Sequence, residues 1–159
     1  MLNERLGEIA QLPEPPYIQC GAGESKLLAG IRSFVASFSA QPGNFEKAFN
    51  TTMEELVRVK QHGFTATELE RAKTAIKSQY EKMYAGRQTV QNERYVNEYT
   101  NVFFQNDAAP GIAYESEFVN KVLPNITVEE INALGNLYIR PDNAVVLGFY
   151  PESSEKTFS

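Results

Sequence analysis

The sequence predicts an α+β fold in which a mixed or antiparallel sheet is covered by helices. Strand-like stretches come early in the chain, a long run of amphipathic helices follows, and an apolar stretch near the C-terminus reads as a closing strand. The order shows no regular βαβ alternation and no internal repeat. A length of 159 residues suits one domain, or a large part of one.

The first helix is predicted over residues 2–10, where four apolar side chains share one face and a proline cluster at 13–16 ends the pattern. A helix start is usually marked by a capping side chain, and none precedes this one. We therefore expect the domain to begin upstream of Met1.

Two neighbouring strands are expected next. Residues 17–20 read as a strand that leads into Gly21 and Gly23, and residues 31–40 alternate between apolar and serine positions. The Gly-x-Gly pair lacks the third glycine of a dinucleotide-binding turn. We expect these glycines to lie in a loop or bulge between the two strands.

Helices are predicted through the middle of the chain. The first follows Asn44, ends at Gly63, and places on one stripe the apolar residues Phe45, Ala48, Phe49, Met53, Leu56 and Val57. Two segments have the capping-box pattern that starts a helix, Thr65 to Glu68 and Thr127 to Glu130. Between them, a helix is expected around Tyr95 to Phe103 and a shorter one over residues 112–123.

The closing strand is predicted over residues 144–150, which are apolar on both faces. That pattern is typical of an interior strand in a sheet covered by helices. Because three strands make a small sheet for so many helices, we expect further strands upstream. Residues 151–159 read as a polar tail, so the domain is assigned to residues 1–150.

The charge balance restricts the partners. The chain has 15 basic and 20 acidic residues and a formal net charge of −5, which disfavours a surface that neutralises many phosphates. No apolar run is long enough to span a bilayer. The sequence thus predicts no nucleic-acid partner and no membrane partner.

Catalytic and metal-ligating residues are predicted to be absent from this chain. A catalytic zinc usually takes three protein ligands, and the helical histidine motifs need two histidines, whereas His62 and Cys20 are single. His62 is expected at the end of a helix, where an imidazolium complements the helix dipole. Cys20 is expected as a small buried residue on a strand.

Two other letter patterns are interpreted as structural. Ser153 to Lys156 matches Ser-x-x-Lys, but it lies in the predicted tail, where nothing would hold it in place. The carboxylate pairs Glu54-Glu55 and Glu129-Glu130 are adjacent in sequence, so their side chains diverge on a helix. Solvated faces and caps are the expected roles.

A resemblance to a known family rests on several segments in order. The segment His62-Gly63-Phe64-Thr65-Ala66-Thr67-Glu68-Leu69-Glu70-Arg71-Ala72-Lys73 resembles the G-[FI]-T-x-x-E-L-x-x-A-K segment of the pitrilysin/insulinase-type zinc peptidases, the inverted zincins. Asn3 to Leu6 is similar to the family's N-x-R-L helix, and residues 110–115, 123–132 and 142–146 resemble its connecting helices and final strand. The resemblance covers residues 2 to 150.

The resemblance implies that this chain does not itself carry the catalytic residues of the family. In the family, zinc is held by His-x-x-Glu-His and a downstream Glu of the first domain, and none of those residues is present here. The chain is then the C-terminal part of a non-catalytic domain, the second of a long bacterial member. Its implied partners are the catalytic domain of the same polypeptide and a peptide substrate, its cofactor is zinc in the parent only, and its location is the bacterial periplasm or cell envelope.

One residue is a candidate substrate contact. The family pairs an Arg on the first helix with a Tyr on the next strand, and here Gln11 occupies the Arg position while Tyr17 lies near the Tyr position. Because the pair is broken, Tyr17 is either a peptide contact or an ordinary packing residue. Two alternative functions stay open: a stand-alone interaction or assembly protein of the same fold, and an unrelated enzyme without histidine chemistry.

Overall fold

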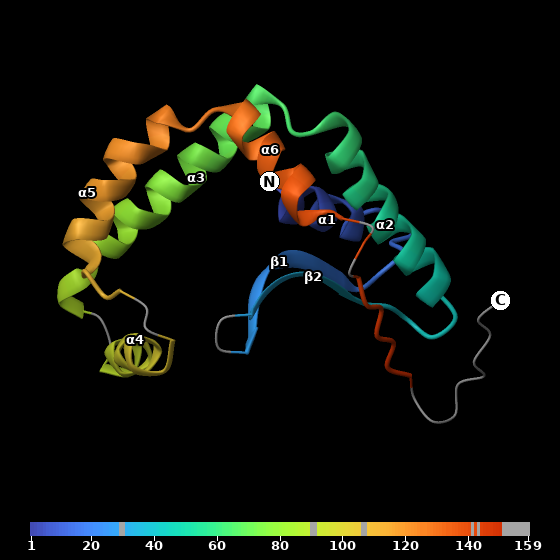
Figure 1. Ribbon diagram of the computed structural model, residues 1–159, viewed down its shortest axis with the longest axis horizontal. Helices are drawn as coiled ribbons and strands as arrows, with labels where there is room; N and C mark the ends of the chain where they lie inside the picture. The colour runs from blue at the N-terminus through green and yellow to red at the C-terminus, as the bar shows by residue number, and fades with distance from the viewer. Residues whose placement is uncertain (29–30, 90–91, 106–107, 141, 143, 151–159) are drawn as a thin grey trace. The chain divides into compact units, whose positions relative to one another are not determined.

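The computed structural model describes residues 1–28, 31–89, 92–105, 108–140, 142 and 144–150. Its helices and strands, labelled in Figure 1, are α1 (Leu2–Ala10), β1 (Gln19–Leu28), β2 (Ile31–Ser39), α2 (Phe45–His62), α3 (Ala66–Ala85), α4 (Asn92–Gln105), α5 (Ile112–Val122) and α6 (Val128–Tyr138). Short 3-10 turns cover Arg87–Thr89 and Leu123–Asn125. These elements confirm the α+β class.

The chain divides into two compact units. Unit 1 comprises Met1–Leu27, Arg32–Gly63 and Asn132–Ser159, and unit 2 comprises Leu28–Ile31 and Phe64–Ile131. All of β1 but its last residue and all of β2 but its first residue lie in unit 1, together with α1 and α2. The helices α3, α4 and α5 lie in unit 2.

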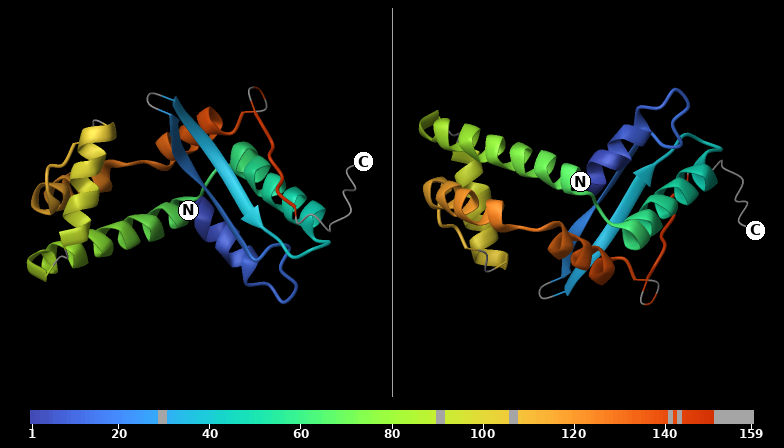
Figure 2. Two further views of the ribbon diagram at one scale, coloured as in Figure 1. Left: turned by 90° about the horizontal axis from the view of Figure 1, so that it is seen from below. Right: turned by 90° about the horizontal axis from the view of Figure 1, so that it is seen from above.

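Unit 1 is built on the β1–β2 hairpin, with α1 and α2 on the same face of it (Figure 2). A backbone bond of 2.7 Å from the Ile18 amide to the Ser39 carbonyl extends the pairing beyond β1. The buried apolar side chains beneath the helices are Leu6, Tyr17, Ala48, Leu56 and Val59. Segments distant in sequence thus share one small core.

The alternation predicted for the second strand is confirmed. The ring of Phe34 lies 5.8 Å from that of Tyr138, and the ring of Phe38 lies 5.3 Å from that of Phe45. Val35, between them in sequence, points the other way and is 40% exposed. Strand geometry sends successive side chains to opposite faces, so the phenylalanines face the helical layer.

The prediction of a loop at the glycine pair is wrong. Gly21 and Gly23 lie inside β1, which continues to Leu28, and so they do not form a loop between the strands. Between them, the Ala22 amide donates a 2.7 Å hydrogen bond to Oδ1 of Asn3 on α1. Glycines without side chains suit a stretch of strand that another element approaches closely.

The predicted closing strand is also wrong. Residues 144–150 form no strand, and the sheet of the described residues consists of β1 and β2. Val145 is 83% exposed and Phe149 is 92% exposed, while the ring of Tyr150 lies 4.9 Å from that of Phe45. Apolar composition favours burial, but a strand also needs the edge of a neighbouring strand with which to pair.

The apolar stripe predicted for α2 is only partly correct. Ala48 and Leu56 are buried as expected, whereas Met53 and Val57 are each 42% exposed. The buried face instead includes two polar residues, Thr52 and Glu55, each 3% exposed. The helix therefore presents a mixed face to the core and leaves two apolar side chains outside.

Unit 2 is a helical unit in which α5 packs along α3. Both predicted capping boxes are formed. Glu68 accepts a 2.8 Å bond from the Thr65 amide and its own amide donates to Thr65 Oγ1 at 3.3 Å, and the corresponding distances between Thr127 and Glu130 are 2.9 and 3.3 Å. Each box satisfies donors that a helix N-terminus would otherwise leave unpaired.

Candidate functional site

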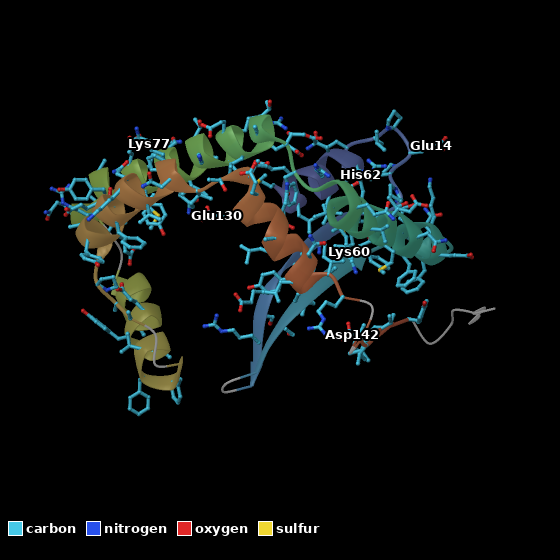
Figure 3. The ribbon with its side chains drawn as sticks, turned by 45° about the horizontal axis from the view of Figure 1, so that its top comes forward. Glu14, Lys60, His62, Lys77, Glu130 and Asp142 are labelled. Atoms are coloured by element: carbon cyan, nitrogen blue, oxygen red, sulfur yellow. The ribbon has the colours of Figure 1, made fainter. Side chains whose placement is uncertain are left out.

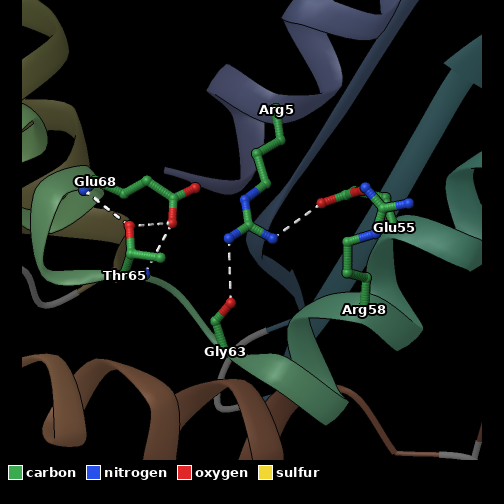
Figure 4. A network of polar contacts seen from close by, with 6 residues as sticks. All are labelled: Arg5, Glu55, Arg58, Gly63, Thr65 and Glu68. Atoms are coloured by element: carbon green, nitrogen blue, oxygen red, sulfur yellow. Dashed lines mark hydrogen bonds and ion pairs between the residues drawn. The ribbon is translucent and has the colours of Figure 1, made fainter.

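A polar cluster in unit 1 is formed by Arg5, Glu55, Arg58 and Gly63 (Figure 4). Arg5 Nη1 donates to Glu55 Oε1 at 3.1 Å, and Arg5 Nη2 donates to the Gly63 carbonyl at 3.1 Å. The other oxygen of the carboxylate, Oε2, lies 3.3 Å from Arg58 Nη1. Glu55, expected on a solvated face, is thus a buried acceptor.

The local folding of the two helices explains this cluster. Leu6 enters the core of unit 1, and its neighbour Arg5 sits at the margin of that core, from which the long side chain reaches α2. Gly63 follows the last residue of α2 and has a φ of +67°, a conformation that favours glycine. A guanidinium on the carbonyl there complements the negative end of the helix dipole. The cluster therefore fixes α1 against the end of α2.

Tyr17 lies in the core beside this cluster. Its side chain is 2% exposed, and its hydroxyl donates a 2.9 Å bond to the Leu6 carbonyl. Burial, and then the nearby thiol of Cys20 and carboxylate of Glu55, raise the pKa of Tyr17 to about 12. The phenol is engaged in packing here, and its contact with a peptide stays a prediction.

Cys20 is half-buried on β1, in keeping with the packing role expected for it. Its Sγ lies 3.5 Å from Thr52 Oγ1, which itself donates to the Ala48 carbonyl at 2.8 Å. Burial raises the pKa of the Cys20 thiol, although the bonds with Thr52 and the Gly21 amide act in the opposite direction. A thiol kept protonated is a poor nucleophile, because the thiolate is the reactive form.

His62 is the last residue of α2, as predicted, and its side chain is exposed (Figure 3). It lines one end of a shallow depression of about 410 Å³ that runs along the outside of the helix. Among the described residues, no three side chains of His, Cys, Asp or Glu come together to hold a metal ion. The donor set here does not fit a zinc site.

The remaining letter patterns show no site among the residues that the structure describes. Ser153 and Lys156 lie outside the described residues. Glu130 is a helix cap, as expected for one member of its pair. The polar cluster of Arg5 and Glu55 was missed from the sequence, and the N-x-R-L resemblance at Arg5 was the only signal that could have drawn attention to it.

Comparison with known proteins supports the resemblance to the zinc peptidases over part of the chain. Residues 14–76 match the family model described as the Peptidase M16 inactive domain. This match confirms the resemblance to the zinc peptidases. The matched region runs from the proline cluster through β1, β2 and α2 into α3, so it includes both the hairpin and the first capping box.

Similar proteins come from a plant and a bacterium. A zinc protease PQQL-like protein of Arabidopsis thaliana is 23% identical over 153 residues, which are 96% of this chain and 13% of that protein. The first half of the periplasmic protease PqqL from Escherichia coli matches with a TM-score of 0.77 and 20% identity, over 86% of this chain and 30% of that one. For the whole PqqL structure the TM-score is again 0.77, with 15% of that chain covered.

The matched proteins are much longer than this chain. The chain spans about an eighth of the length of its plant relative, and under a third of the bacterial half-protein. No helix among the described residues is long and apolar enough to cross a membrane. The matches therefore establish the fold and a similarity of residues 14–76 to the inactive domain of the family.

Proposed function

We propose that this chain is a non-catalytic segment of a zinc-dependent endopeptidase, which packs on the catalytic domain and shapes the chamber that holds the peptide. The observation that carries the proposal is the match of residues 14–76 to the inactive domain of the family. The resemblance at His62 to Lys73, read from the sequence, falls across the end of that same region.

The side chains of the chain support a structural role. Three polar side chains in and beside the core of unit 1 are bonded within the unit: Arg5 to Glu55, Tyr17 to the Leu6 carbonyl, and Thr52 to the Ala48 carbonyl. Peptide hydrolysis by zinc needs an open metal position and a carboxylate that activates water. Those groups belong, on this proposal, to another domain of the parent polypeptide, and peptide bonds are broken there.

A surface suited to packing on another domain is present at residues 144–150. The large apolar side chains there are exposed, at 83% for Val145, 67% for Val146, 76% for Leu147 and 92% for Phe149. Contiguous exposed apolar side chains are typical of a surface that another protein segment covers. We infer that the rest of the parent covers them.

The bacterial relative supports a proposal for the compartment. PqqL of Escherichia coli is described as a periplasmic protease. On that basis we place the parent of this chain in the bacterial periplasm or cell envelope.

Zinc titration of the isolated chain tests the assignment of chemistry. Isothermal calorimetry is expected to show no binding at micromolar zinc, because no suitable ligand set is formed among the described residues. Peptide cleavage by the chain alone should equally be undetectable. A stoichiometric site with tight affinity, or cleavage that zinc restores after chelation, would overturn the proposal.

The gene and hydrogen exchange test the packing role. A reading frame that continues upstream of Met1 and encodes His-x-x-Glu-His supports the peptidase parent, whereas start and stop codons around these residues support a stand-alone assembly protein. In the parent, the amides of residues 144–150 are expected to be protected from exchange, and in the isolated chain they should exchange freely. Equal exchange in both would contradict the packing role.

A further inference from the structure

The outer face of α2 carries a stripe of side chains that are not part of the core of unit 1. The side chains that line the depression of about 410 Å³ are Asn50, Met53, Glu54, Val57, Arg58, Gln61 and His62. These positions recur at intervals of three and four residues, so they follow one face of a single helix. We call this face the α2 stripe. Its apolar members, Met53 and Val57, are each 42% exposed.

The α2 stripe has two different flanks. On a helix that turns about 100° per residue, Met53 and Val57 lie together on one flank of the face. Glu54 and Arg58 lie together on the other flank, with Glu54 towards the N-terminus and Arg58 towards the C-terminus. Apolar side chains thus run along one side and opposite charges along the other.

This pattern is complementary to itself. When two copies of a helix pack antiparallel around a two-fold axis, each flank meets the same flank of the other copy in the opposite direction. An axis between residues 55 and 56 brings Met53 within one residue of the level of Val57 of the second copy, an offset of about 1.5 Å along the helix. It brings Glu54 equally near the level of Arg58 of the second copy, and both pairs occur twice.

We propose that the α2 stripe is a contact between two copies of this chain, with their α2 helices antiparallel about a two-fold axis. The charges favour this occupant, because a second copy presents a cation to Glu54 and an anion to Arg58. Arg58 is available for the contact, since its side chain is 63% exposed while it lies beside Glu55. The contact is independent of the proposed peptidase role.

The expected dimer is weak. One helix face with two central apolar side chains buries less surface than a stable interface requires, so its size is that of a transient complex. The charge pairs lie at the rim of the contact. They therefore determine the orientation and the partner more than the strength of binding.

Sedimentation equilibrium of the chain tests the proposal. The chain is expected to associate reversibly into dimers as its concentration rises. Glu54→Arg turns both attractive charge pairs into repulsive ones and should raise the dissociation constant about tenfold. Glu54→Arg combined with Arg58→Glu exchanges the charges and should restore the dimer. Glu8→Arg is the matched control, because it makes the same charge change at an exposed position on α1.

Several outcomes would overturn the proposal: a chain that stays monomeric at every concentration, a dimer that Glu54→Arg leaves intact, or equal weakening by Glu8→Arg. Arg58→Glu adds a carboxylate beside Glu55, so circular dichroism must show that the double variant is folded. Should it fail to fold, Val57→Lys provides the second arm, since it puts a cation on the apolar flank and keeps Arg58. Weakening by both Glu54→Arg and Val57→Lys, with Glu8→Arg unchanged, supports the contact.

Discussion

Unit 1 buries a carboxylate beside two guanidinium groups, whereas the glutamates of the two capping boxes in unit 2 lie at helix N-termini. The Glu55 pair joins residues 50 positions apart, while each capping bond of unit 2 joins residues three positions apart. The same side chain therefore performs two different tasks. In unit 1 it connects distant segments, and in unit 2 it starts a helix within its own turn.

The buried residues of the two units show the same contrast between distant and local contacts. The core of unit 1 draws side chains from α1, from the segment before β1 and from α2. In unit 2, the described buried side chains are Leu69 and Ser116, one on α3 and one on α5. Unit 1 thus depends on contacts that form only when the chain has folded back on itself. Unit 2 depends more on helix propensity and local caps.

The largest expected effect is that of removing the cation from the buried pair. Arg5→Met leaves Glu55, which is 3% exposed, without its closest partner and should lower the free energy of unfolding of unit 1 by about 4 kcal/mol. Arg58→Met removes the exposed partner of the same carboxylate and should cost less than about 1 kcal/mol. Unfolding in urea, monitored by hydrogen exchange, measures the loss of stability in both variants. Equal losses would show that Glu55 does not need Arg5.

A core truncation tests whether the units unfold separately. Leu6→Ala removes a side chain that is 0% exposed and should destabilise unit 1 by about 3 kcal/mol. Hydrogen exchange should accelerate in α1, β1 and α2 and stay unchanged in α3 and α5. The matched change in unit 2, Leu69→Ala, should have the opposite distribution. Acceleration across both units after either change would show one cooperative structure.

The buried phenol makes unit 1 sensitive to alkali. Because the pKa of Tyr17 is raised to about 12 in the folded chain, the unfolded chain ionises first as the pH rises above the ordinary tyrosine value of 10.0. Stability from this group is complete below pH 10 and is lost between pH 10 and about 12. Tyr17→Phe should remove this loss of stability at high pH. At neutral pH it should lower the free energy of unfolding by about 1.5 kcal/mol, since the Leu6 carbonyl loses the bond from the phenol.

Denaturant unfolding at several pH values measures this dependence. Tyr84→Phe, at a position that is 40% exposed, is the control and should leave the pH profile unchanged. If the stability of Tyr17→Phe depended on pH as that of the original chain does, another group would be responsible for the loss of stability in alkali.

The smallest expected effect concerns the capping boxes of unit 2. Thr65→Ala removes the oxygen that accepts from the Glu68 amide and should destabilise α3 by about 1 kcal/mol. Thr67→Ala, at an exposed position in the same turn, should change stability little. Faster exchange in the first turn of α3, with unit 1 unaffected, is the expected result. An effect on unit 1 as large as that on α3 would contradict the local character of the cap.

The sequence was informative about where helices begin and end and about the alternation along β2. The bounds of α1 and α2, the start of α3 at Thr65 and the alternation along β2 all follow from patterns within a few residues. The burial of Glu55 could not be predicted, because it depends on Arg5 arriving from a distant helix. Residues 144–150 show the same limit, since apolar composition does not supply a neighbouring strand.

The exposed segment at 144–150 also affects how the chain behaves in a concentrated solution. Apolar segments that are rich in β-branched and aromatic residues and lack charge and proline have the composition that self-associates into cross-β assemblies. Here the segment is bordered in sequence by Pro141 and Asp142 on one side and by Pro151 and Glu152 on the other. Prolines and like charges at both borders oppose stacking of identical chains. The apolar side chains are then available to pack on a folded neighbour, while the flanking residues oppose aggregation of the chain.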